Sequence, residues 1–177
     1  LAALVAAWFV ALMAFCAENN VGISYLSENG KFLARVYGAQ KGNVLLRKAQ
    51  YAISDNEMES LAIARPIVAA KVANYRNLLL RHQRNHPDEC PDSVGLTAET
   101  MGQRLMEIQR AESLDGLRGY EGECAALYFG VLSALITVQQ EDFIFTGRTK
   151  RPPLDPANAL LSFLYASLLV SLKLYLA

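Results

Sequence analysis

The stretch GRTKRPPLDPANALLSFLY, residues 147–165, joins a stiff basic loop to the start of a helix. Three cations precede a rigid pair of prolines in this loop: Arg148, Lys150 and Arg151. Asp155 followed by Pro156 then predicts a helix start, because a carboxylate caps free N–H groups and proline suits the first helical position. A loop of this kind could hold a phosphate backbone, and the rest of the chain must supply any chemistry beside it.

The helix predicted after Pro156 is apolar except for one polar stripe. Asn158, Ser162 and Tyr165 recur at i, i+4 and i+7, so they share one helix face. Two interpretations remain open for Asn158 and Tyr165. They either support a neighbouring site, or they are packing residues whose polar groups bond to nearby backbone.

Composition indicates a folded chain with no general attraction for nucleic acid. The 177 residues suffice for a domain with a core, and the 53% apolar content argues against disorder. Lysine and arginine total 17, as do aspartate and glutamate, so nucleic-acid binding would depend on local clusters. Three widely spaced cysteines are typical of reduced thiols, so we expect a cytoplasmic protein: Cys16, Cys90 and Cys124.

Two uncharged runs raise the question of a membrane. Leu1–Ala17 and Ala157–Leu172 are both shorter than the roughly 20 residues that a spanning helix needs. We therefore expect buried core helices and no membrane, with a small helical membrane protein as an alternative. The chain begins with Leu1 and ends at Ala177 within an apolar run, which favours a fragment.

The N-terminal part has the alternating pattern of β-strands. Val21–Ser27 and Lys31–Tyr37 alternate between apolar and polar residues around Asn29–Gly30, a hairpin turn signal. Asn43–Tyr51 is a third candidate strand. Three strands need a covering layer to be stable, so we expect further structure against them.

From Ser54 onward the apolar residues follow a helical period. Ser54 and Glu57 predict a capping box at the start of a long helix that runs to about Asn85. Pro66 should kink or shorten this helix. Its polar face is mostly basic, and a solvated surface is the plain interpretation of these residues: Arg65, Lys71, Asn74, Arg76, Arg81 and Arg84.

The connection after this helix contains possible metal ligands. His82, His86 and Cys90 suggest zinc, but their spacing matches no common structural zinc pattern, so a linker is the plain interpretation. Two further helices are predicted beyond it: Thr97–Glu112 and Ser113 to about Thr137.

One carboxylate lies within the apolar stripe of the last of these helices. Glu121 follows Leu117 by four residues and precedes Cys124 by three. A carboxylate among apolar neighbours is costly to ionise unless a cation, hydrogen bonds or a metal compensates. Glu121 is therefore either half of a buried ion pair with an arginine, or a metal ligand or general base.

Three glycines recur around this carboxylate: Gly116, Gly119 and Gly122. Each costs about 1 kcal/mol inside a helix relative to alanine, which predicts close approach by another helix or a substrate. No phosphate-binding P-loop, nucleophile elbow or dinucleotide fingerprint is present in the sequence. Among nucleophilic, cofactor and metal chemistries, only metal chemistry has a positive indication in the sequence.

Segments spread over most of the chain resemble a known family. They are FCAENNVGISYLSENGKFLARVYG (15–38), GNVLLRKAQY (42–51), LAIARPIVAAKVANYRNLLLR (61–81), and LRGYEGECAALYF (117–129) together with residues 147–165. In this order they are similar to the CRISPR-associated protein 1 family, the integrase of CRISPR adaptation.

The resemblance implies an α+β fold and a DNA-processing activity. A β-rich N-terminal domain, partial here, would cover residues 1–51, and a mostly α-helical catalytic domain would cover residues 52–177. Members are DNA endonucleases and integrases that depend on Mg²⁺ or Mn²⁺ and insert new spacers into a CRISPR array, when a spacer 3′-hydroxyl attacks a phosphodiester. The implied partners are prespacer and repeat DNA, a second copy in a homodimer, and CRISPR-associated protein 2.

The resemblance also implies a site. The family's metal ligands are a glutamate, a histidine and an aspartate, and the glutamate of its Glu-Gly motif maps onto Glu121. The histidine and aspartate map onto no residue here, so we expect little or no nuclease activity from this chain alone. A catalytically inert DNA-binding or scaffolding relative is the alternative. The expected DNA contacts are the three loop cations, Arg148, Lys150 and Arg151. Arg76 and Arg81 are weaker candidates. Asn158 and Tyr165 would support the metal site.

Overall fold

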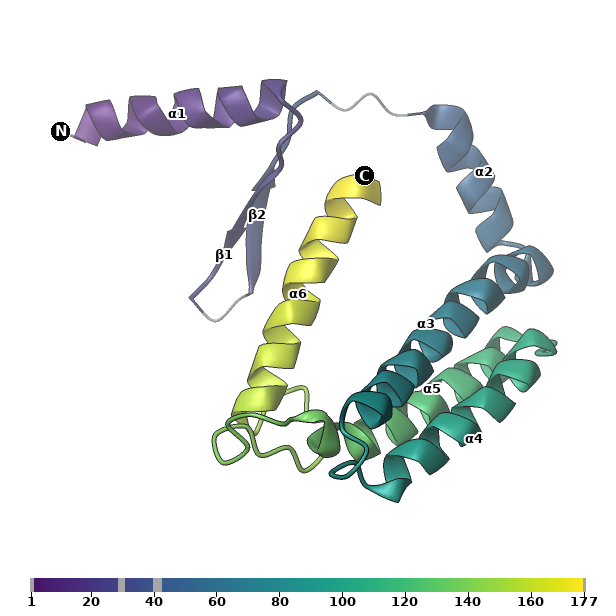
Figure 1. The fold of residues 1–177 in the computed structure, drawn as a ribbon. Helices are drawn as coiled ribbons and strands as arrows, with labels where there is room; N and C mark the ends of the chain where they lie inside the picture. Colours follow the sequence, from purple (N-terminus) through teal and green to yellow (C-terminus); the bar gives the residue numbers. More distant parts are fainter. Residues whose placement is uncertain (1, 29–30, 40–42, 177) are drawn as a thin grey trace. The chain divides into compact units, whose positions relative to one another are not determined.

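The computed structural model describes residues 2–28, 31–39 and 43–176, and its elements are mostly helical (Figure 1). The elements in chain order are α1 (Ala2–Glu18), β1 (Ile23–Leu26), β2 (Phe32–Val36), α2 (Val44–Ser54), α3 (Glu57–Asn85), α4 (Asp92–Gln109), α5 (Leu114–Val131), a 3₁₀ turn (Leu132–Leu135) and α6 (Pro156–Leu176). The predicted α+β class is confirmed. Contacts divide the chain into two compact units, Leu1–Val44 with Ala159–Ala177, and Leu45–Asn158. The predicted boundary between residues 51 and 52 stays a prediction.

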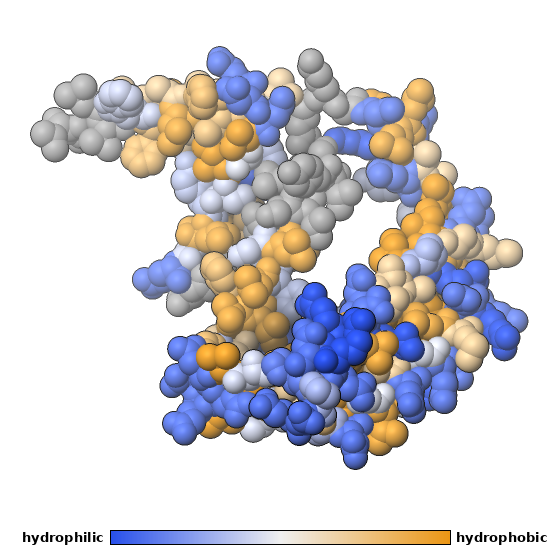
Figure 2. All heavy atoms as spheres, viewed as in Figure 1, coloured by the Kyte–Doolittle hydropathy of each residue, from blue (hydrophilic) through white to orange (hydrophobic). Residues whose placement is uncertain are grey.

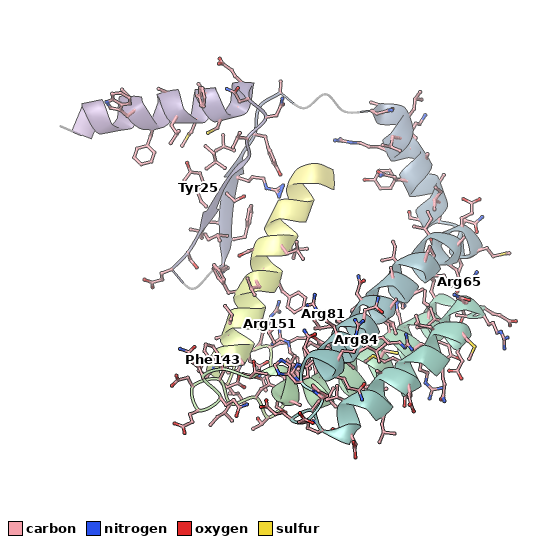
Figure 3. All side chains as sticks on the ribbon, in the orientation of Figure 1. Tyr25, Arg65, Arg81, Arg84, Phe143 and Arg151 are labelled. Carbon is pink, nitrogen blue, oxygen red and sulfur yellow. The ribbon has the colours of Figure 1, made fainter. Side chains whose placement is uncertain are left out.

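The predicted hairpin is present in the first unit. Strands β1 and β2 pair antiparallel, with Tyr25 (labelled in Figure 3) opposite Ala34. Beyond the strands, the backbone N–H of Ser27 donates to the carbonyl of Lys31 at 2.8 Å. The turn residues Asn29 and Gly30 lie outside the described part of the chain.

Helix α1 is more exposed than its apolar sequence predicts. Trp8 is 75% exposed, Phe9 and Leu12 are each 53% exposed, and Figure 2 shows apolar side chains on the visible face of this helix. In α6, Phe163 is 58% exposed. The expectation of buried core helices is therefore wrong for most of the described residues of α1 and α6, although Ala157 and Asn158 at the start of α6 are buried. Of the helices in the described part of the chain, none combines the length and apolar character needed to cross a membrane, so the membrane alternative gains no support.

The prediction of a third strand at Asn43–Tyr51 is wrong, because these residues begin α2. The segment is rich in leucine, arginine, lysine, alanine and glutamine, which favour helices. Its short alternation of apolar and polar residues fits a strand or a helix equally well. Near the end of α2, Ser54 Oγ donates to the carbonyl of Tyr51 at 2.7 Å. Ser54 therefore closes one helix instead of capping the next.

The start of α3 corrects the predicted capping box. Asn56 caps the helix, since its Oδ1 accepts from the backbone N–H of Met58 at 3.0 Å and of Glu59 at 3.2 Å. The helix continues through Pro66 and ends at Asn85, so the predicted C-terminal boundary is confirmed.

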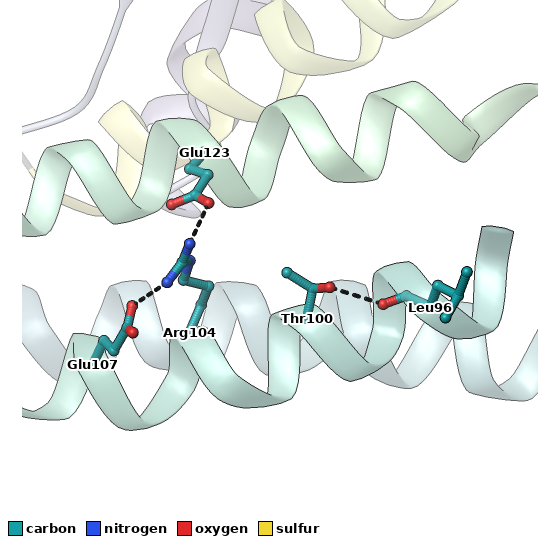
Figure 4. Close-up of polar contacts among 5 residues, drawn as sticks. All are labelled: Leu96, Thr100, Arg104, Glu107 and Glu123. Carbon is teal, nitrogen blue, oxygen red and sulfur yellow. Dashed lines mark hydrogen bonds and ion pairs between the residues drawn. The ribbon is translucent and has the colours of Figure 1, made fainter.

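The core of the second unit lies between α3, α4 and α5. Its fully buried side chains come from all three helices: Val72, Leu79, Val94, Met101, Ile108 and Cys124. Burial raises the pKa of the Cys124 thiol, so this cysteine is a neutral core residue. At the edge of the core, Arg104 of α4 bridges Glu107 at 2.6 Å and Glu123 of α5 at 2.7 Å (Figure 4). This arginine fixes α4 against α5, next to the turn of α5 that carries Glu121.

Candidate functional site

Glu121 lies on α5 at the edge of the apolar stripe and pairs with Lys71 of α3. Its neighbours in the stripe, Leu117 and Cys124, are buried, whereas the Glu121 side chain is 34% exposed and that of Lys71 is 41% exposed. Lys71 Nζ donates to Glu121 Oε1. An ion pair was one of the two predicted interpretations, but the partner is a lysine and the pair is only partly buried.

Aromatic rings connect this ion pair to the basic loop. Lys71 Nζ lies 5.7 Å from the ring centroid of Tyr75, which stacks on Tyr128 of α5 at 4.2 Å with an interplanar angle of 9°. Tyr128 meets the edge of Phe129 at 5.5 Å, and the guanidinium of Arg148 lies 6.0 Å from the Phe129 ring. Each ring carries a negative face that attracts the adjacent cation. The carboxylate and the loop are thus parts of one packed structure.

A buried asparagine organises the basic loop. Asn158 is 0% exposed, and its Oδ1 accepts from Arg148 Nη1 at 2.8 Å and from the backbone N–H of Thr149 at 3.0 Å. Its Nδ2 donates to the carbonyl of Gly147 at 2.7 Å and to Asp155 Oδ2 at 2.6 Å. Both donors and both acceptor positions of the Asn158 amide are occupied. Asn158 therefore fits the packing interpretation, in which the polar groups of a buried side chain bond to their neighbours.

The helix start predicted from Asp155 and Pro156 is confirmed. Asp155 Oδ1 accepts from the backbone N–H of Asn158 at 2.7 Å, and Pro156 is the first residue of α6. These hydrogen bonds, first from the Asn158 backbone and then from its side chain, lower the pKa of Asp155. Gly147, at φ +155°, takes a backbone conformation that residues with a side chain rarely adopt. The loop is therefore fixed at both ends.

The three loop cations have different surroundings. Arg148 is half-buried, and its Nη1 also donates to the carbonyl of Thr149 at 2.6 Å, whereas Lys150 and Arg151 are exposed. Arg148 and Lys150 line a groove of about 390 Å³ whose opposite wall is formed by residues of α5: Ala125, Ala126, Phe129 and Gly130. Ala125 follows Glu121 by one helical turn, so the groove begins on the side of α5 that carries the carboxylate.

The two weaker DNA candidates also differ. Arg76 is half-buried, and its Nε donates to the carbonyl of Ala98 at 3.1 Å, which joins α3 to α4. Arg81 is exposed and, with Arg84 and Asn77, lines a groove of about 620 Å³ along α3. Figure 3 labels Arg81 and Arg84, and Figure 2 shows strongly hydrophilic side chains over this end of α3. The geometry favours Arg81 over Arg76 as a contact for a polyanion.

Within the described part of the chain, no three histidine, cysteine, aspartate or glutamate side chains are grouped to hold a metal ion. The rings of His82 and His86 lie 4.8 Å apart, but Cys90 Sγ is directed to the carbonyl of Pro91, so the zinc interpretation gains no support. Glu121 suits one position around a hard divalent cation, which prefers oxygen ligands. By itself it does not complete such a site.

Two expectations around Glu121 have different outcomes. A Cβ on Gly119 or Gly122 would meet no atom within 4 Å among the described residues, so the predicted close approach by another helix of the chain is wrong there, and close approach by a substrate stays a prediction. Tyr165 is 49% exposed and belongs to the other compact unit, so its supporting role stays a prediction.

The chain matches the family model described as CRISPR associated protein Cas1 over residues 9–173. It belongs to the Cas1 family. The CRISPR-associated endonuclease Cas1 2 of Rhodospirillum rubrum is 46% identical over 162 residues, which cover 89% of this chain and 46% of the relative. The CRISPR-associated endonuclease Cas1 1 of Chlorobaculum tepidum is 39% identical over 155 residues, covering 87% and 45%. The chain thus spans about half the length of these Cas1 relatives.

Solved structures share the fold. A casposase bound to its integration product has a TM-score of 0.67 at 22% identity, covering 87% of this chain and 41% of that one. A Cas1 protein from Thermotoga maritima has a TM-score of 0.62 at 23% identity, covering 85% and 45%. A chain of a Cas6-RT-Cas1–Cas2 complex has a TM-score of 0.62 at 26% identity, covering 85% and 16%. The helical arrangement described above is thus a Cas1 fold.

The Cas1 sequence pattern pointed to Glu121 but not to Lys71 or the stacked tyrosines. Lys71 directly precedes the buried Val72 and lies one turn before Tyr75, so it stands at the border of the apolar face of α3. That border position was the sequence signal that could have identified Lys71. A lysine there can reach across to a carboxylate on the next helix while its stem remains on apolar surface.

Proposed function

We propose that this chain takes part in a Cas1-type, metal-dependent DNA endonuclease and integrase activity that inserts new spacers into a CRISPR array. Family membership and relatives named as endonucleases support this proposal. The observation that carries it is the placement of Glu121 one turn from a groove lined by Arg148 and Lys150. A carboxylate near a groove lined by cations is compatible with phosphoryl transfer on DNA, in which negative charge on the phosphate must be stabilised.

The groove residues would hold the DNA backbone. Cationic side chains bind phosphates independently of base sequence, and this binding weakens as salt concentration rises. Arg148 is held in place by Asn158 and would present a fixed positive charge. Lys150 and Arg151 are exposed and could adjust to the strand. The spacer 3′-hydroxyl would then attack a phosphodiester, forming one P–O bond as another breaks.

We further propose that Glu121 contributes one oxygen ligand to Mg²⁺ or Mn²⁺. When bound, such a cation would stabilise charge on the transferring phosphate. The histidine and aspartate of the family pattern map onto no residue of this chain. The 177-residue chain alone is therefore expected to have little or no nuclease activity.

The proposed partners are prespacer and repeat DNA, a second copy of the chain, and a CRISPR-associated protein 2, all in the cytoplasm. DNA and Cas2 are supported by two structural neighbours, a casposase with its integration product and a Cas6-RT-Cas1–Cas2 complex. The second copy rests on the family resemblance alone.

A catalytically inert DNA-binding or scaffolding role is the second candidate. It is favoured by the ion pair of Glu121 with Lys71, together with the lack of a three-residue metal group among the described residues. In this case the grooves would bind DNA, and no residue of the chain would be needed for strand transfer.

Spacer integration distinguishes the two candidates. The protein is expressed from its own gene with a Cas2 protein, and integration of a labelled prespacer into a CRISPR plasmid is measured. We expect Glu121→Gln to abolish integration and leave DNA affinity unchanged, while Glu112→Gln, at an exposed glutamate before α5, has no effect. Undiminished integration by Glu121→Gln contradicts the enzymatic proposal.

The expected inactivity can be tested with the purified 177-residue chain. Robust cleavage of DNA with Mg²⁺ or Mn²⁺, lost on Glu121→Ala, would show that this expectation is wrong.

A further inference from the structure

The loop before α6 presents a short apolar tip directly after its cations. Leu154 is 74% exposed, and the two residues before it, Pro152 and Pro153, are exposed as well. Lys150 and Arg151 precede this tip and are also exposed (Figure 3 labels Arg151). Residues 150–154 therefore join two positive charges to an apolar surface that faces solvent.

The exposure of Leu154 is not explained by packing within the loop or the helix. A leucine directly before the N-cap of a helix can pack against the first turns as a hydrophobic staple. Leu154 has this position, because Asp155 caps α6, yet most of its side chain remains in contact with solvent. The same connection does bury Phe145, which is 7% exposed. Since single exposed leucines are common on protein surfaces, the surroundings of Leu154 must decide its role.

The backbone that carries Leu154 is fixed by hydrogen bonds. The backbone N–H of Leu154 donates to Thr149 Oγ1 at 3.1 Å, and the N–H of Thr149 donates to the buried Asn158 at 3.0 Å. Between these points, the rings of Pro152 and Pro153 restrict the backbone further, because proline fixes φ near −65°. The apolar tip is thus presented on a braced loop, at a small cost in conformational entropy when it binds.

A fixed apolar tip beside cations suits duplex DNA. Cationic side chains hold phosphates of any sequence, and proteins that kink DNA insert side chains such as leucine or proline between adjacent base pairs. Leu154 follows Arg151 by three residues, so a phosphate contact and an inserted side chain could fall on neighbouring nucleotides. A protein partner with an apolar surface suits this tip less well, because Lys150 and Arg151 would lose their hydration against it.

We propose that Leu154, supported by Pro153, is a wedge that enters a base step of duplex DNA while Lys150 and Arg151 hold the adjacent phosphates. This inference rests on the proposed function only in taking the basic loop as a DNA contact. No covalent bond changes when the wedge enters. Its effect is to unstack and kink the duplex next to the cationic groove.

The test measures unstacking and binding by the purified protein expressed from its own gene. Duplex DNA that contains 2-aminopurine, an adenine analogue whose fluorescence rises when it is unstacked, serves as the probe. We expect the wild type to raise this fluorescence, and to bind a duplex with a mismatched step about three- to tenfold more tightly than a matched one, because the mismatch is already partly unstacked.

The variants separate the wedge from the cations. Leu154→Ala should lose the fluorescence rise and the preference for the mismatch, whereas Leu154→Met, which keeps a long apolar side chain, should retain both. Leu96→Ala, at a leucine of α4 that is 62% exposed, is the matched control and should behave as the wild type. Circular dichroism establishes that each variant is folded.

Three results would overturn the proposal. They are the absence of a fluorescence rise with the wild type, a rise that persists in Leu154→Ala, and a loss of the rise that is equally large in Leu96→Ala. Normal unstacking by Leu154→Ala together with weakened binding to a Cas2 protein would make the leucine a protein contact, and would overturn the proposal as well.

Failure of this inference is distinct from failure of the proposed function. Integration that depends on Glu121, without unstacking by the wild type, removes the wedge and retains the integrase. Unstacking that depends on Leu154, without integration by the wild type, removes the integrase and retains the wedge.

Discussion

Two polar junctions of the second unit, one at Asn158 and one at Glu121, are built in opposite ways. Asn158 is fully buried and its amide makes four hydrogen bonds within the loop and the first turn of α6. Glu121 is partly exposed and is held by the single lysine Lys71. A junction with every bond satisfied fixes the shape of the basic loop. A junction with one solvent-screened contact contributes little to the stability of the fold.

The largest effect should come from breaking the Asn158 junction. Asn158→Ala removes four hydrogen bonds and leaves the carbonyl of Gly147 and the N–H of Thr149 without this partner. We expect a loss of about 2–4 kcal/mol in the free energy of unfolding, since buried groups left unsatisfied cost about 1–3 kcal/mol each. Urea denaturation measures it. The control is Asn77→Ala on the exposed face of α3, and a similar loss in both variants would contradict a special role for Asn158.

The next effect concerns the two exposed cations of the loop that Asn158 shapes. Replacing Lys150 and Arg151 with alanine should weaken DNA binding and reduce the slope of log affinity against log salt by about 2, one for each lost phosphate contact. Fluorescence anisotropy over a range of salt concentrations measures both quantities. If affinity and slope stay the same, the loop does not bind the phosphate backbone.

A smaller effect is expected from the cap of α6 at low pH. The folded-state pKa of Asp155 is lowered by hydrogen bonds from Asn158, so the cap's contribution is complete above the unfolded value of about 4 and is lost as the pH falls through the folded pKa. Asp155→Asn keeps a capping oxygen without a charge that titrates. Between pH 6 and 3 the melting temperature of the wild type should therefore fall further than that of the variant. If the melting temperatures of the two proteins fall in parallel with pH, the Asp155 carboxylate does not contribute to the pH dependence of stability.

The smallest effect should be the stability contribution of the Lys71–Glu121 pair. A double-mutant cycle with Lys71→Met and Glu121→Gln should give a coupling energy below about 1 kcal/mol, because both side chains are partly solvated. Chemical denaturation of the four proteins measures it. A coupling of 3 kcal/mol or more would place this junction in the same rigid class as Asn158.

The sequence predicts the buried junction at Asn158 better than the partly exposed one at Glu121. Asp155 and Pro156 predict a helix start through local chemistry, and Asn158 lies in the first turn of that helix. Its partners Arg148, Thr149 and Gly147 belong to the loop that directly precedes the helix. Glu121 was detectable because a carboxylate breaks an apolar stripe. Its partner was not, because Lys71 lies 50 residues earlier and meets it only when α3 packs on α5.

Other errors came from sequence patterns with two physical solutions. Residues 43–51 alternate over too short a range to separate strand from helix, and local propensity favoured the helix α2. The apolar composition of α1 predicted burial, but burial depends on a neighbouring layer that composition does not specify.

Nuclear magnetic resonance with added Mn²⁺ locates the cation on the protein. Paramagnetic broadening is followed for the backbone amides of the 177-residue chain as Mn²⁺ is titrated. If Glu121 is the ligand, the amides of Gly122 and Lys71 should broaden first, and Glu121→Gln should remove this effect. Broadening that begins instead at His82, His86 and Cys90, or that persists around Gly122 in Glu121→Gln, would contradict the assignment of Glu121 as the metal-binding carboxylate.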